Sequence, residues 1–163
     1  MNVLHPPFVH FVVALPVAAL FAQLTYLANG ERTYARVALR ILAFTLLMGL
    51  FALYTGNVDA EKIRTAGAIL PAGLSTLEAH RSFATWLLVI LFLTIIVKWI
   101  AASKESRSRG KLALGMILIT NDATLYQGNK GRELVYRYSA GIDGKIIDKR
   151  LETPRPNPTQ PKE

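Results

Sequence analysis

The chain has 163 residues, of which 52% are hydrophobic, and its mean hydropathy of +0.30 is high for one soluble domain. It contains no cysteine, which excludes disulfides, thiolate metal sites, iron–sulfur clusters and a covalently attached c-type haem. The formal net charge of +8 is carried by turns and a tail without interleaved aromatic residues. We therefore expect no nucleic-acid partner.

The apolar residues are gathered in blocks, which is typical of membrane helices. Residues 8–29 contain no charged side chain, and a helix of this length crosses the roughly 30 Å hydrocarbon core. Pro7 suits the first turn of this helix, and Pro16 predicts a kink. No positively charged stretch precedes the block and no small-residue cleavage pattern ends it, so we expect a membrane span and not a cleaved signal peptide.

Two further spans follow. After a polar turn at 30–33, the second span is expected over 37–56 and ends at the sequence GNVD, and residues 58–79 are expected to form a loop. The third span is expected over 76–102, because Ser75 and Glu78 have the Ser-x-x-Glu spacing of a capping box. Its apolar body ends at Lys98 and Trp99, which we interpret as an interfacial anchor.

The fourth span, over 112–138, is the least apolar, because Asn121 and Asp122 follow its apolar start. The polar tail over 143–163 is proline-rich at its end, which predicts disorder. The fold class is therefore all-α, an integral-membrane four-helix up-and-down bundle spanning residues 1–142. We expect this bundle to be surrounded by membrane lipid.

Charge asymmetry predicts the orientation of this bundle. The two short turns that join spans one to two and three to four hold eight basic side chains against one acid in each turn, Glu31 and Glu105. The positive-inside rule places these turns in the cytoplasm and both termini outside. The eight basic residues are Arg32, Arg36, Arg40, Lys98, Lys104, Arg107, Arg109 and Lys111.

The three histidines all fall at the external end of this topology. Spans one and three run in the same direction, and His10 and His80 each lie near the start of their helix, with His5 just before. In an up-and-down bundle these helices are diagonal, about 12–14 Å apart. Two imidazoles that reach inward across that diagonal predict a bis-histidine haem b site with His10 and His80 as axial ligands to iron.

The surroundings of these two histidines suit a macrocycle. Ala14 and Ala84 lie four residues after the ligands, on the same helix faces, and leave room for a flat ring. Arg81 is placed to meet the haem propionates, as are Lys62 and Arg64. His5 is the substitute ligand for His10, which we prefer because it lies inside a helix.

Other interpretations stay open. The histidines are also explained as interfacial side chains without a ligand, or as a mononuclear zinc, copper or iron site in which His5, His10 and His80 are joined by Asp59. Asp122 within a span is expected to face the bundle interior or a water path, as a proton relay or as a structural pair of Asn121, Arg36 or Arg40. Gly128 and Gly131 are expected to allow close helix contact. No nucleophile elbow or phosphate loop is present, so we expect no independent catalytic activity.

Four motifs occur here in one order: HPPFVHF at 5–11, TGNVDA at 55–60, His80 at the start of span three, and GRELVY at 131–136. This order resembles a bacterial family of small membrane proteins catalogued as domain of unknown function twenty-two thirty-one, over residues 5 to about 142. The resemblance implies a four-helix inner-membrane protein that is often suspected of binding haem b through its histidines. Family members often carry a His-Gly pair after the last motif, where this chain has Tyr138 and Ser139.

Two functions are expected from these features. The first is an electron-transfer subunit with one haem b near the periplasmic face, whose partners are other membrane redox subunits or a periplasmic electron carrier. The alternative is a cofactor-free structural or assembly subunit of a larger membrane complex, and a homodimer is a further option. A proton or metal-ion permease that uses Asp122 is a third and weaker reading, since four spans are few for that task.

Overall fold

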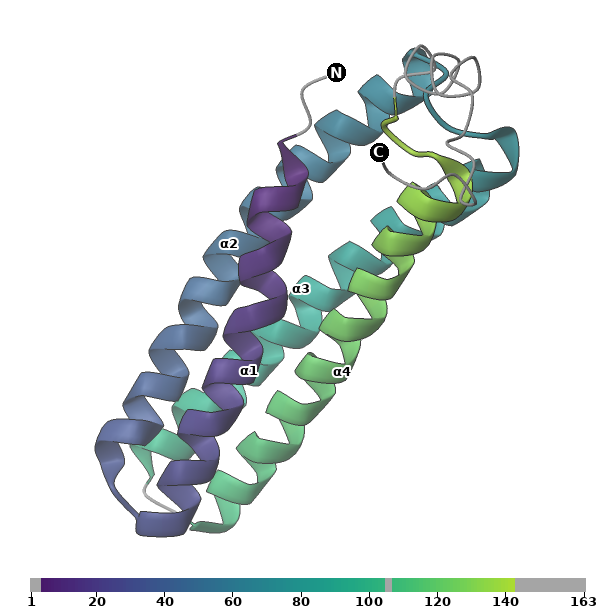
Figure 1. The fold of residues 1–163 in the computed structure, drawn as a ribbon. Helices are drawn as coiled ribbons and strands as arrows, with labels where there is room; N and C mark the ends of the chain where they lie inside the picture. Colours follow the sequence, from purple (N-terminus) through teal and green to yellow (C-terminus); the bar gives the residue numbers. More distant parts are fainter. Residues whose placement is uncertain (1–3, 105–106, 143–163) are drawn as a thin grey trace, which may run out of the picture.

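The computed structural model describes residues 4–104 and 107–142, which form four long helices. These are α1 (His5–Asn29), α2 (Arg32–Thr65), α3 (Leu74–Ser103) and α4 (Arg107–Tyr138), with the short 3-10 turn η1 (Pro71–Gly73) before α3. The helices run up and down side by side (Figure 1). The described residues include no strand, so the predicted all-α four-helix bundle is confirmed.

The order of the helices around the bundle puts α1 and α3 on a diagonal. α1 packs against α2 and α4, and α3 packs against the same two helices. α1 begins at the end of the bundle where α4 ends (Figure 1). The expected diagonal relationship of the first and third helices is therefore confirmed.

Three of the helical segments are long and apolar enough to cross a membrane: His5–Asn29, Arg32–Thr65 and Pro71–Ser103. α4 has a spanning length of 32 residues but a lower hydropathy. Its predicted span is thus present as a helix, although its composition alone does not mark it as membrane-crossing. The predicted tail, residues 143–163, lies outside the described residues.

The end of the second helix was predicted wrongly. α2 does not stop at Gly56 but continues to Thr65, so much of the expected loop over 58–79 is helical. Ala60 and Ile63 are buried one turn apart on this extension, and Ala60 packs with Leu77 of α3 and Leu134 of α4. That burial stabilises the helix beyond a glycine that would otherwise favour its end.

The predicted capping box is also absent. α3 begins at Leu74, directly after the η1 turn, and no side chain caps its first turn. The Glu78 carboxylate instead pairs with Arg81 at 3.2 Å and with Arg64 at 3.6 Å. The Pro71–Gly73 turn leads directly into α3, so the helix starts at Leu74, before the Ser75–Glu78 motif could cap it.

Buried side chains form three apolar layers along the bundle. The first layer, farthest from the histidines, takes one residue from each helix; the second lies nearer the histidines, and the third closes the end where α1 begins. Their buried members are Ala19, Leu42, Leu91 and Ile117; then Val12, Ala52 and Leu87; then Ala60, Leu77, Leu134 and Ala140. The layer of Val12, Ala52 and Leu87 packs α1 and α3 against α2 within about two turns of His5 and His80.

Polar contacts between helices support this packing. Asn121 of α4 donates from Nδ2 to the carbonyl of Pro16, the proline within α1, at 3.2 Å. The Thr94 and Thr120 hydroxyls meet at 2.8 Å between α3 and α4. Asp122, by contrast, is exposed on α4. The expectation that Asp122 faces the bundle interior is therefore wrong, because its neighbour Asn121 takes the inward position.

Lys98 is buried and is not the interfacial anchor that its sequence position suggested. It is 0% exposed, and its Nζ has no hydrogen-bond partner among the described residues. Its Nζ lies over the face of the Tyr26 ring, 5.2 Å from the centroid. A cation–π contact of this kind contributes at most about 2 kcal/mol, less than the several kcal/mol that burying an ammonium costs.

Replacing Lys98 with methionine should therefore stabilise the protein. Lys98→Met keeps the side-chain length and removes the uncompensated buried charge, so we expect a gain of about 1 kcal/mol or more and a melting temperature higher by at least about 2–4 °C. Circular dichroism during thermal unfolding in detergent measures the shift. Lys104→Met, at an exposed position, is the matched control and should change little. A lower melting temperature for Lys98→Met would show that the buried ammonium is net stabilising.

Candidate functional site

A polar layer lies between the apolar layer of Val12, Ala52 and Leu87 and the one that closes the end of the bundle. It joins two histidines from the diagonal helices: the ring centroids of His5 and His80 are 6.4 Å apart and the ring planes are nearly perpendicular, at 88°. Gln127 of α4 completes the layer. The structure thus brings one α1 histidine to His80, as expected from the topology, and that histidine is His5.

His5 is held by α2 in two ways. The Asp59 carboxylate accepts hydrogen bonds at Oδ2 from the backbone amides of Leu4 (2.7 Å) and His5 (2.8 Å). The ring Nδ1 of His5 lies 2.8 Å from the Ala52 carbonyl oxygen. A carbonyl only accepts, so Nδ1 carries the proton and Nε2 has a free lone pair. This is the arrangement by which a backbone carbonyl fixes the tautomer of a metal-binding histidine.

The capping role of Asp59 gives a stability prediction. Asp59 is 3% exposed, and its carboxylate supplies charge-assisted bonds to two amides at the start of α1. Asp59→Ala should lower the free energy of unfolding by about 1–3 kcal/mol, because both amides lose their acceptor. Thermal unfolding in detergent tests this. Glu61→Ala removes an exposed acid from the same helix, and an equal loss in both variants would contradict the capping role.

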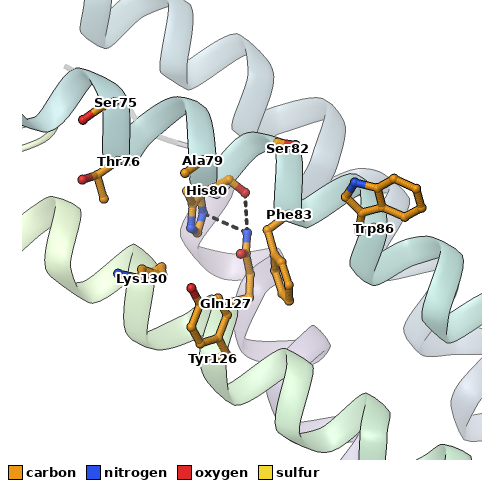
Figure 2. Close-up of a pocket in the computed structure, with 10 residues that line it drawn as sticks. All are labelled: Ser75, Thr76, Ala79, His80, Ser82, Phe83, Trp86, Tyr126, Gln127 and Lys130. Atoms are coloured by element: carbon orange, nitrogen blue, oxygen red, sulfur yellow. Dashed lines mark hydrogen bonds between the residues drawn. The ribbon is translucent and has the colours of Figure 1, made fainter.

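His80 is contacted by Gln127. The Gln127 Nε2 donates to the His80 carbonyl at 2.9 Å and lies 3.3 Å from the ring Nε2 (Figure 2). Two buried atoms, His80 Nδ1 and Gln127 Oε1, have no hydrogen-bond partner among the described residues. An unpaired buried polar atom costs about 1–3 kcal/mol, so a group that bonded to either atom would stabilise this layer.

Two glycines make room for the imidazole rings. A Cβ at Gly56 of α2 would lie 2.9 Å from Nδ1 of His5, and a Cβ at Gly131 of α4 would lie 3.3 Å from Cε1 of His80. Any larger residue at position 56 would displace the His5 ring. Gly131, which was expected to allow close helix contact, instead accommodates a histidine ring.

A partly open cavity of about 690 Å³ adjoins the two rings and is lined from all four helices. This volume lies within the range of small-molecule and cofactor sites. Most of the lining is apolar, and its polar members include His5, His80, Gln127, Arg81, Arg132, His10, Asn57, Asp59, Thr124 and Tyr136. The cavity can therefore take a largely apolar ligand whose charged groups reach the two arginines.

The other residues singled out in the sequence are placed as follows. His10 lines the same cavity but is exposed, and its Nδ1 lies 2.7 Å from the Pro6 carbonyl one turn earlier. Ala84 lines the cavity, whereas Ala14 is exposed. Arg81 lines it and bonds to Asn57 and Glu78. Ala14 thus does not provide the room that its spacing suggested.

The alternative of a mononuclear metal site is not supported. Within residues 4–104 and 107–142 no group of three or more His, Asp or Glu side chains is close enough to hold a metal ion. Asp59, the expected carboxylate ligand, is occupied by backbone amides and by Lys62 at 3.4 Å. Lys62 and Arg64 are likewise engaged in ion pairs, with Asp59 and Glu78.

Gln127, Gly56 and Ala52 were not recognised from the sequence as site residues. Gln127 lies 47 positions from His80, and Ala52 acts through its backbone carbonyl. No pattern of neighbouring residues in the sequence predicts contacts between residues so far apart, or contacts made by a backbone carbonyl. The one available signal was the pair of glycines within the TGNVDA and GRELVY motifs, because a glycine inside a helix often marks a close approach by another group.

The fold and site define a class: a four-helix membrane bundle with a half-buried histidine pair and an adjoining open cavity near one end. The family model described as "Predicted membrane protein (DUF2231)" matches residues 2–144, and the chain belongs to this family. The resemblance noted from the motifs is confirmed, and the protein is a membrane protein with transmembrane helices. No curated protein and no solved structure matches the chain.

Proposed function

We propose that this protein is an electron-transfer subunit of the bacterial inner membrane that holds one haem b with His5 and His80 as axial ligands. The observation that carries the proposal is the 6.4 Å separation of the two ring centroids. A metal bonded to one nitrogen of each ring at about 2 Å, with each nitrogen about 1 Å from its centroid, requires a separation of roughly 6 Å. The observed spacing agrees with that value.

Three further features fit a haem at this place. The His5 tautomer leaves Nε2 free, Gly56 and Gly131 leave room for both rings, and the His80 Nδ1 is buried without a partner. The adjoining cavity has a volume of about 690 Å³ and a mostly apolar lining. Cofactor sites in helix bundles are commonly built from facing helices in this way.

His5 is preferred here to His10 on structural grounds. The His10 ring has the same Nδ1 contact to a carbonyl, so tautomer does not separate the two. Burial separates the two histidines, because His10 is exposed while His5 is half-buried beside His80. A half-buried ligand held by its neighbours is better fixed in direction than an exposed one.

Each residue of the site has a defined task under this proposal. Bound haem supplies one-electron transfer, and the axial ligands set its potential. The Ala52 carbonyl orients the His5 ring, and Asp59 fixes the start of α1. Arg81 and Arg132 line the cavity and provide positive charge for carboxylates. The closing layer around Leu77 and Leu134 excludes water from one side.

The orientation of the subunit follows from its charges. The basic turn at the start of α2 lies at the end of the bundle opposite to His5 (Figure 1). If the positive-inside rule holds, the histidine pair is near the periplasmic face. A periplasmic carrier or a neighbouring membrane redox subunit would then exchange electrons there.

A pyridine haemochrome assay on the detergent-purified protein tests the proposal. We expect one haem b per chain in protein from cells supplied with ample haem precursor. A featureless visible spectrum from such cells would overturn the proposal and favour a cofactor-free assembly subunit. Co-purification with a larger complex would then be the next measurement.

A further inference from the structure

The outer face of α4 carries a carboxylate at the middle of the membrane. Asp122 is exposed, and it makes no hydrogen bond or ion pair with any residue that the structure describes. Its neighbour Asn121 bonds to the carbonyl of Pro16, near the middle of the spanning helix α1. At 1.5 Å per residue this level is roughly 16–20 Å from either end of α1. An aspartate side chain is too short to reach the lipid head groups over this distance.

A carboxylate at this depth requires a covering other than lipid. Acidic side chains within membrane helices almost always face protein or a water-filled cavity. The inner side of α4 is already packed against α1 and α3, and Asp122 does not line the cavity beside the histidines. A second polypeptide on the outer face of α4 would remove the carboxylate from lipid.

The residues above and below Asp122 indicate what this polypeptide is. Gly115, Asp122 and Asn129 recur at every seventh position of α4, and all three are exposed. Leu118 and Leu125, each three residues further along, are 45% and 55% exposed. Small or polar residues at one heptad position, with leucine three residues later, form the contact line of two helices that coil around each other. We call these five residues the α4 seam.

The α4 seam is complementary to a second copy of itself. Copies of one membrane protein insert in the same orientation, so a two-fold axis along the membrane normal makes their α4 helices parallel. Identical residues then face each other across the axis. The Asn129 amide both donates and accepts, and a protonated Asp122 donates to an ionised one. A different protein would need matching polar residues at the same seven-residue spacing, whereas a copy supplies them by symmetry.

We propose that the protein is a parallel homodimer whose interface is the α4 seam. The two Asp122 carboxyl groups share a proton at mid-membrane, and the two Asn129 amides bond nearer the histidine end. Gly115, where an added Cβ would meet nothing within 4 Å in one chain, allows the helices to approach closely. The dimer does not depend on haem, because the seam lies on the outer face of α4 and the histidine pair lies between the helices.

Cysteine cross-linking in native membranes tests this interface, because the natural chain has no cysteine. Leu125→Cys places a single thiol on the α4 seam. Val89→Cys is the matched control on α3: Val89 is 43% exposed, and the contact of Thr94 with Thr120 puts residues 89 and 125 at a similar depth. After oxidation with copper phenanthroline, we expect a disulfide-linked dimer of twice the chain mass in Leu125→Cys and mostly monomer in Val89→Cys.

The contribution of Asp122 is measured by the strength of association. Energy transfer between full-length chains in detergent, each labelled at a cysteine added to the C-terminus, gives the dissociation constant of the dimer. Asp122→Leu should weaken association about fivefold or more, whereas Asp122→Asn keeps a hydrogen-bonding pair and should stay within about twofold of the natural chain. Glu61→Ala, which removes an exposed acid from α2, should leave association unchanged.

Three cross-linking results would overturn the proposal: no dimer in Leu125→Cys, equal dimer in Leu125→Cys and Val89→Cys, or a cross-link from Leu125→Cys to a protein of another mass. Unchanged association in Asp122→Leu would also overturn it. Haem content is measured separately and reports only on the proposed function.

Discussion

His80→Ala should lower the haem b content of the purified protein by at least about tenfold, whereas His10→Ala should leave it near the wild-type value. The reason is geometric: His80 lies 6.4 Å from His5 in the bundle core, and His10 is exposed with its Nδ1 on the Pro6 carbonyl. The intensity of the Soret band per mole of chain measures the content in all three proteins.

Folding must be separated from ligation in this experiment. Far-UV circular dichroism reports whether the His80→Ala protein keeps its helices. If it does not, His80→Gln takes its place, because glutamine is a polar side chain of similar size. Loss of the Soret band in His10→Ala, with the band retained in a folded His80 variant, would contradict the assignment.

Gly56→Ala should weaken haem binding by about 10–100-fold although it makes the helix more favourable. An added Cβ would lie 2.9 Å from the His5 Nδ1 and 3.0 Å from its Cε1, so the ring must move. That movement breaks the 2.8 Å hydrogen bond to the Ala52 carbonyl and turns the free nitrogen away from His80. Titration of haem into the purified apoprotein gives the affinity.

Gly115→Ala is the matched control for this substitution. An added Cβ at Gly115, in α4, meets nothing within 4 Å. It should therefore raise the stability by up to about 1 kcal/mol and leave haem affinity unchanged. Equal affinities in the two variants would show that the Gly56 contact does not position His5.

The bundle itself was predictable because its signals are local. An uncharged run such as residues 8–29 specifies a helix of spanning length, and short polar turns force neighbouring helices to be antiparallel. From that order alone, α1 and α3 had to be diagonal. The same reasoning placed histidines from these two helices at one end of the bundle.

The details of the site were not predictable in this way. His10 was preferred because it lies within a helix, but Asp59, 54 residues from His5, extends α1 so that His5 is helical as well. Gly56 looked like a helix end until the His5 ring was seen to occupy the space beside it. Both errors have one physical cause, a long-range contact that overrides a local preference.

The position of Lys98 also could not be predicted from its sequence neighbours. A lysine beside a tryptophan at the end of an apolar run is typical of an interfacial anchor. Whether it points to lipid head groups or into the bundle depends on the rotation of α3, which packing against α2 and α4 decides. In the folded protein Lys98 is buried over Tyr26, and Trp99 is the exposed member of the pair.

The spin state of the haem tests most directly whether the His5 and His80 imidazoles share one iron. Electron paramagnetic resonance and visible spectra of the oxidised wild-type protein should show six-coordinate, low-spin iron. His5→Ala, loaded with excess haem to offset its weaker binding, should be high-spin and return to low-spin when free imidazole is added, while His10→Ala stays low-spin throughout. If His5→Ala keeps the low-spin spectrum, or His10→Ala loses it, the two rings that meet in this bundle do not ligate a common iron.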